Sequence, residues 1–235
     1  MSTTPPREYA WQPNAALSQA SNAAQFMRVL GVASWKELVR CGDEDPERFH
    51  RALLDHVDFR FYRPYGAVLD ESRGAPWARW CVGGTTNVVL NVLDRWRGTP
   101  TWDKAAIDWE GEDGARQTLS YRELDREVCR LAGGLRALGL VPGDVVATYL
   151  PNLPEAMVAM LAVAKIGAVL MPLFSGFGAD AVAARLLTGG AKAVITVDAS
   201  LRRGKLVGAK AVVDEAAAQC PGLVHVLVLR HAGTP

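Results

Sequence analysis

The sequence predicts an α/β fold with a mostly parallel, helix-flanked sheet, preceded by a mainly helical and irregular N-terminal segment. Three observations lead to this prediction. Short Val-rich runs alternate with helical patterns from residue 145 onward, the first 90 residues are rich in Trp, Arg and Pro, and 49% of the 235 residues are hydrophobic. Alternation of this kind is typical of a parallel sheet with helices on both faces.

Helical signals dominate the first region. Residues 21–32 and 45–57 have helical patterns, and in the second of these Asp45 is a good N-cap with Pro46 in the first helical position. The acidic cluster around it, formed by Asp43, Glu44, Asp45 and Glu47, is therefore interpreted as a helix start rather than a catalytic carboxylate pair. Residues 59–80 are expected to be irregular and aromatic.

The Gly-Gly-Thr-Thr run at residues 83–86 resembles a phosphate loop, but no Lys follows it within reach. We interpret it as a glycine turn before an amphipathic helix, with Asn87 as a good N-cap and Thr86 as an acceptable one. The apolar positions of that helix are Val88, Val89, Val92, Leu93 and Trp96.

The second region begins with a hairpin, because residues 105–111 and 117–121 flank a turn-rich stretch. Ser120 and Glu123 form a capping box that starts a helix to about Leu138. Strands are then predicted at 145–150, 168–174, 192–198 and 224–230, and helices at 154–167, 179–187 and 210–220. The apolar stretch 145–174 is interrupted by three prolines and two charges, which favours a buried strand, helix and strand over a membrane span.

Composition narrows the function. The 26 basic and 25 acidic residues nearly cancel, which argues against nucleic-acid binding. Four cysteines without metal-ligand spacing indicate reduced thiols in a cytoplasmic protein, and residues 1–14 have no apolar core of a secretory signal. We expect no metal site and no membrane partner.

Two motifs are candidate ligand sites. Residues 176–181 match G-x-G-x-x-A between a strand and a helix, with Asp198 about 20 residues on, as in dinucleotide-binding proteins. Against this, Pro172 removes a donor from the preceding strand, and only 37 residues follow Asp198. The second motif is the cluster of Arg202, Arg203 and Lys205 around Gly204, which suits a phosphate at the carboxyl end of a strand or is a solvated turn.

The chain resembles the N-terminal part of AMP-forming acyl-CoA synthetases of the acetyl-CoA synthetase type, in the adenylate-forming superfamily. The resemblance runs from about Trp11 to the C-terminus and is carried by residues 48–56, 76–96, 105–114, 119–169, 174–186, 195–205 and 213–221. It implies that residues 1–90 form the segment that packs on the adenylating domain. Residues 91–235 would then be the first, incomplete part of the synthetase/ligase domain.

By this resemblance the complete enzyme is an acid-thiol ligase that uses ATP with Mg²⁺ and CoA, with a short-chain acid such as acetate as substrate. Arg202 and Lys205 fall at positions that contact CoA phosphates, with Arg203 and Gly204 in the same turn. Phe174, Ser175 and Gly176 fall on the turn along which pantetheine runs. No catalytic residue falls in this chain, because its sequence has no phosphate loop or catalytic Lys of the family.

The chain alone is therefore expected to be inactive, with the C-terminal part of the ligase as its partner. The alternatives are a noncatalytic module that binds CoA or a partner through an open sheet edge and, ranked last, a dinucleotide-binding domain.

Overall fold

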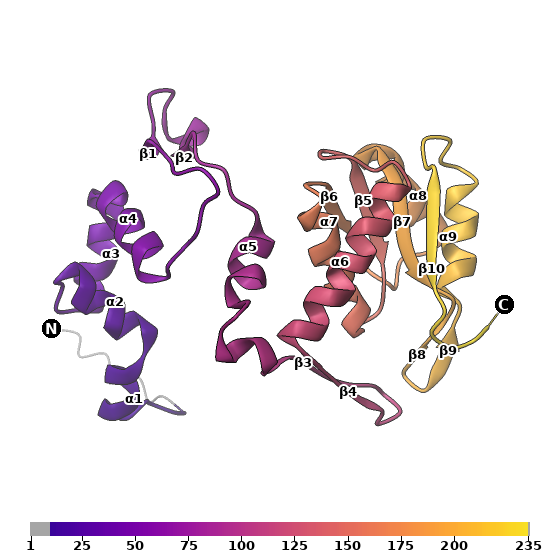
Figure 1. The fold of residues 1–235 in the computed structure, drawn as a ribbon, viewed down its shortest axis with the longest axis horizontal. Coiled ribbons are helices and arrows are strands. Elements are labelled where there is room, and N and C mark those ends of the chain that lie inside the picture. The colour runs from indigo at the N-terminus through magenta and orange to yellow at the C-terminus, as the bar shows by residue number, and fades with distance from the viewer. Residues whose placement is uncertain (1–9, 235) are drawn as a thin grey trace, which may run out of the picture. The chain divides into compact units, whose positions relative to one another are not determined.

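The computed structural model describes residues 10–234, and the chain divides into two compact units, up to Thr86 and from Asn87 onward (Figure 1). The expectation of no secretory signal was drawn from residues 1–14, of which residues 1–9 lie outside the described part. Each unit has its own core. The functional assignment of residues 1–90 and 91–235 as two segments stays a prediction.

Four helices build most of the first unit. Each starts at a side chain that caps its free N–H groups: Asn14, Ser21, Ser34 and Asp45. The bounds are α1 Ala15–Ala20, α2 Asn22–Leu30, α3 Trp35–Glu44 and α4 Pro46–His56. Asp45 and Glu47 begin α4 as expected, whereas Asp43 and Glu44 end α3, so only half of the acidic cluster is a helix start.

Residues 59–80 are more regular than expected. An antiparallel ribbon joins β1 Ala67–Asp70 to β2 Arg79–Val82, with a short 3₁₀ helix, Ala75–Trp77, between them. The irregular assignment was wrong here because each strand has only four residues. So short a run gives little period-2 signal.

The second unit opens with short elements. Asn87 caps α5 Val88–Val92, but the expected helix is broken after Val92 and continues as the 3₁₀ turn Asp94–Trp96, followed by another at Pro100–Asp103. The hairpin of β3 Ala105–Glu110 and β4 Arg116–Ser120 is confirmed. So is the capping box of Ser120 and Glu123 at the start of α6 Tyr121–Ala137.

A four-stranded parallel sheet forms the body of this unit, in the order β10-β7-β5-β6. Helices α6 and α7 pack on one face, and α8 and α9 pack on the other (Figure 1). The bounds are β5 Val145–Tyr149, α7 Pro154–Lys165, β6 Val169–Pro172, α8 Ala179–Gly189, β7 Ala191–Val197, α9 Ala209–Ala217 and β10 His225–Leu229. The predicted fold class is confirmed.

Two details differ from the prediction. Strand β6 is a half-exposed edge rather than a buried strand, which is why Pro172 is tolerated at its end. The basic cluster of Arg202, Arg203 and Lys205 was predicted as a turn with no strands, but it lies in a second hairpin, β8 Ser200–Arg202 with β9 Lys205–Val207. No helix in the described part of the chain is long and apolar enough to cross a membrane.

Candidate functional site

The basic cluster lies on the β8–β9 hairpin, where Arg202 pairs directly with Lys205. Residues paired across an antiparallel ladder have their side chains on the same face, so these two cations share one face of the hairpin. Arg203 and Gly204 form the turn between them, both with positive φ (53° and 70°). None of the three basic side chains has a carboxylate partner among residues 10–234, and all three are exposed.

The turn at residues 174–177 is fixed by Tyr149 at the end of β5. The buried phenol oxygen lies 3.0 Å from the carbonyl oxygen of Ser175 and 2.8 Å from that of Phe177. A phenol has one proton, so it donates to one carbonyl at a time. Burial raises the pKa of Tyr149, and the charge of the nearby Arg202 partly opposes that rise.

The hairpin and the turn meet at one side chain, Arg202. Its guanidinium carbon lies 5.3 Å from the centre of the Phe174 ring, and its Nη1 lies 2.6 Å from where a Cβ on Gly176 would be. The absence of a side chain at Gly176 therefore leaves the room that this guanidinium occupies. A second cation, Arg185, lies 4.1 Å from the Phe177 ring, whose centre is 5.5 Å from that of Phe174.

A cavity of about 500 Å³ lies beside this contact. Ser175 and Arg202 line it, together with Trp109 and Glu112 of the β3–β4 hairpin and His231. The structure thus brings four of the predicted residues together, Phe174, Ser175, Gly176 and Arg202. Arg203, Gly204 and Lys205 lie on the same hairpin as Arg202 but do not line the cavity.

Tyr149, Trp109, Glu112 and His231 were not among the predicted site residues. The hairpin that carries Trp109 and Glu112 was predicted, but nothing in its own sequence shows that it reaches the β8–β9 turn. Trp109 is held by a hydrogen bond from its indole N–H to the carbonyl of Asn152 (2.7 Å). Tyr149 could have been suspected only as a polar group inside an apolar strand.

Asp198 has a structural role that conflicts with the dinucleotide interpretation. Its buried carboxylate accepts four backbone N–H groups, from Ala199, His231, Ala232 and Thr234, at 2.7–3.0 Å. Burial alone would raise the pKa of Asp198, but these hydrogen bonds outweigh it and lower the pKa. An acid engaged in this way is not available to a ribose, and the strand before the glycine turn is an edge strand.

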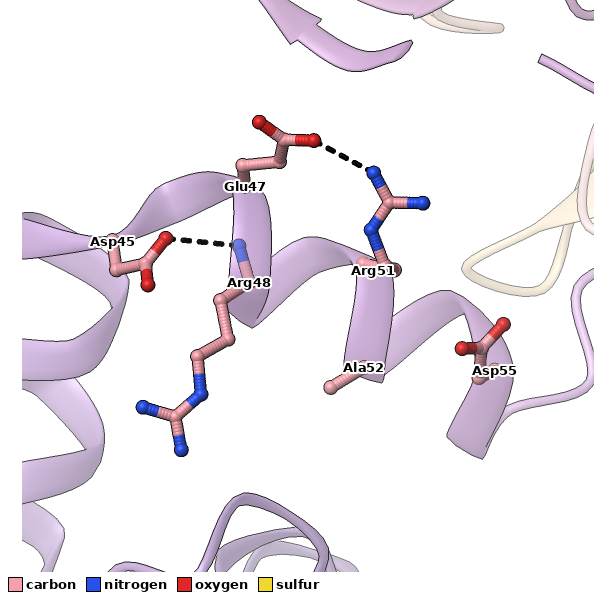
Figure 2. A pocket seen from close by; sticks show the side chains of 6 residues that line it. All are labelled: Asp45, Glu47, Arg48, Arg51, Ala52 and Asp55. Atoms are coloured by element: carbon pink, nitrogen blue, oxygen red, sulfur yellow. Dashed lines mark hydrogen bonds and ion pairs between the residues drawn. The ribbon is translucent and has the colours of Figure 1, made fainter. Parts of the chain in front are cut away.

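The remaining candidates are structural. Gly84 lies under Phe61 and Tyr65, where a Cβ would be 3.1–3.2 Å from their side chains, and Asn87 caps α5. The glycine-turn interpretation of residues 83–86 is therefore confirmed. Figure 2 shows a shallow hollow on α4 in which Asp45 accepts the Arg48 N–H and Glu47 pairs with Arg51 at 2.6 Å. These groups satisfy one another within a single helix.

Comparison with known proteins identifies the family. The model of the AMP-binding enzyme family matches residues 93–233. The chain belongs to this family. A second model, the acetyl-coenzyme A synthetase N-terminus, matches residues 35–92. Among the described residues of this AMP-binding enzyme chain, no group of three or more His, Cys, Asp or Glu side chains is placed to hold a metal ion.

Curated relatives and a solved structure agree with this membership. The chain is 44% identical over 212 residues to acetyl-coenzyme A synthetase of Deinococcus radiodurans, covering 86% of this chain and 32% of the relative. The protein of the same name from Mycobacterium tuberculosis is 45% identical over 200 residues, covering 84% of this chain and 30% of the relative. The structure of acetoacetyl-CoA synthetase from Streptomyces lividans superposes with a TM-score of 0.89 at 31% identity. The match covers 96% of this chain and 35% of that protein. The chain spans about a third of these proteins.

Proposed function

We propose that this chain is the CoA-phosphate-binding part of an AMP-forming acyl-CoA synthetase that acts in the cytoplasm on a short-chain acid such as acetate. In the complete ligase a carboxylate oxygen attacks the α-phosphorus of ATP and pyrophosphate leaves. The CoA thiolate then attacks the acyl carbon and AMP leaves. Mg²⁺ and ATP are assigned to the remainder of the ligase, because the sequence has no phosphate loop of the family and residues 10–234 contain no metal-ligand cluster.

The observation that carries the proposal is the position of Arg202. Its guanidinium lies against Phe174 and Gly176 and has no carboxylate partner in the described part of the chain, and Lys205 lies on the same face of the hairpin. Arginine binds phosphate as a planar fork and lysine binds it as a point charge. Pantetheine is assigned by the family resemblance to the turn of Phe174, Ser175 and Gly176, where the space beside Gly176 holds the Arg202 guanidinium.

The test replaces both cations with acids. Arg202→Glu with Lys205→Glu should weaken CoA binding by about 1.5–3 kcal/mol per lost charge-assisted contact, measured by calorimetry on the chain. In a ligase reconstituted with the C-terminal part of a relative, the KM for CoA should rise while ATP–pyrophosphate exchange stays nearly intact. The matched control is Lys104→Glu with Arg136→Glu, which reverses the same charges at exposed sites away from the cavity. Equal loss in exchange, or an equal effect of the control, would contradict the assignment.

The open edge of β10 supports the partner assignment. No strand of the described chain pairs with its outer side, and Val226 and Val228 are exposed there. A groove of about 590 Å³ between β10, α6 and α7 adjoins this edge. We assign the remainder of the synthetase to this surface, since an unpaired edge beside apolar side chains favours aggregation until it is covered. Coexpression with that remainder should raise the soluble yield, and a noncatalytic module would stay soluble alone.

A further inference from the structure

Two hairpins that are far apart in the sequence meet beside the proposed phosphate site. The Oε2 atom of Glu112, at the tip of the β3–β4 hairpin, accepts a hydrogen bond from the backbone N–H of Gly204 at 3.2 Å. This residue lies in the turn between Arg202 and Lys205. An acidic tip is therefore in direct contact with the basic turn.

The conformation of the turn explains why this N–H is available. Arg203 and Gly204 both have positive φ, and they lie between the last paired residues of the ladder. Amide groups in such a tight turn point away from the ladder and can bind an anionic oxygen. The carboxylate of Glu112 already does so, which shows that the position accepts an anion.

Neighbouring acids on the same hairpin are engaged elsewhere. Glu110 pairs with Arg116 at 3.0 Å across the hairpin, and Asp113 accepts the N–H of Ala115. Glu112 makes no ion pair within residues 10–234, although three cations lie on the hairpin that it contacts. Its contact is with the backbone N–H of Gly204, which lies between Arg203 and Lys205 in the sequence.

We propose that Glu112 is an affinity-determining residue that competes with the phosphates of CoA. Its carboxylate occupies the position of a phosphate oxygen at Gly204, and it leaves that position when the polyanionic ligand binds. Two anions cannot share one N–H without strong repulsion, so ligand binding includes the work of displacing Glu112. The inference rests on the proposed function, because it assumes that CoA binds at this hairpin.

The experiment measures CoA binding to the full 235-residue chain by calorimetry. Glu112→Gln keeps an acceptor but removes the charge, and Glu112→Ala removes both. We expect the Kd for CoA to fall roughly two- to fivefold in each variant, as removal of about one exposed charge contact would give. Adenosine 3′,5′-bisphosphate, which carries phosphates, should show the same gain, whereas pantetheine, which carries none, should not. The matched control is Glu110→Gln, the same charge change on the same hairpin without contact to the β8–β9 turn.

Hydrogen exchange at the Gly204 amide measures its contact with Glu112 in the ligand-free chain. Its protection should fall in Glu112→Ala and stay unchanged in Glu110→Gln. Unchanged or weaker CoA binding in both Glu112 variants, with wild-type binding still sensitive to Arg202→Glu, would overturn this inference and leave the proposed function standing. Absence of CoA binding in every variant would overturn both.

Discussion

The hydroxyl of Tyr149 lies 3.0 Å from the carbonyl oxygen of Ser175 and ties the end of strand β5 to the turn that follows the edge strand β6. Because the phenol is buried, the turn is held by a hydrogen bond from which water is excluded. The Phe174 ring and the Arg202 guanidinium rest on the same turn. The position of Arg202 therefore depends on a residue that does not line the cavity.

Tyr149→Phe should loosen this turn. The loss of one buried hydrogen bond lowers the free energy of unfolding by about 1 kcal/mol, and the carbonyl of Ser175 or Phe177 that loses its donor adds to the effect. We expect weaker CoA binding by calorimetry and a lower urea midpoint. Tyr121→Phe is the control, since it makes the same change at a tyrosine of the same unit whose ring packs against Trp96 and the core, and whose hydroxyl makes no hydrogen bond within residues 10–234. Equal effects of the two variants would show that Tyr149 has no positioning role.

Gly176→Ala should weaken CoA binding with little change in stability. The added Cβ would lie 2.6 Å from Nη1 of Arg202 and 2.5 Å from the Phe174 ring, so the flexible guanidinium has to move. At Gly178, the other glycine of the motif, a Cβ meets nothing within 4 Å. Gly178→Ala is therefore the control and should bind CoA as the wild type does. A dinucleotide fingerprint would require both glycines. Since we assign them to other roles, we expect no NAD binding by the wild type or by either variant.

Asp198→Asn should destabilise the second unit in a pH-dependent way. The pKa of Asp198 is lowered in the folded chain, so its contribution is fully present above the unfolded pKa of about 3.9 and is lost as the pH falls toward the folded value. The gap in urea midpoint between wild type and variant should be wide near pH 7 and narrower near pH 3. Asp103→Asn, which removes an exposed ion pair with Arg122, should show a small gap at both. A gap that widens in acid would refute this role.

The chain alone should not catalyse adenylation. Stabilisation of the charge that develops on the α-phosphate needs preorganised donors or cations, and Arg202 and Lys205 are assigned to the CoA side. ATP–pyrophosphate exchange should stay at background for every short acid tested. Acid-dependent exchange that is abolished by heat and absent from a mock preparation would show that the chain holds catalytic groups.

Much of the second unit was predictable because its signals are local. Helix caps such as Ser120, the alternation of strands and helices, and the glycine turn at 176 are all determined within a few residues. The order of the strands and the edge position of β6 depend on pairing between distant segments. Pro172 gave a partial signal of that edge, because proline is tolerated where a strand pairs on one side only.

The site was predictable only in part for the same reason. Arg202 and Gly176 could be singled out by residue type, but their contact depends on the packing of two loops. The partners Glu112 and Tyr149 are 92 and 26 residues away from the backbone groups that they bind. Short strands such as β8 and β9 were missed because three residues carry little periodicity.

The strand order β10-β7-β5-β6 also has a consequence for synthesis on the ribosome. Strand β5 is made first, β6 and β7 then add to its two sides, and β10 adds to β7. No strand has to insert between two that are already paired. Each newly emerged strand can therefore pair with the exposed edge of a strand that has already been synthesised. A nascent chain can thus build this sheet outward in the order in which it is translated, with β10 as the growing edge when residue 229 has emerged.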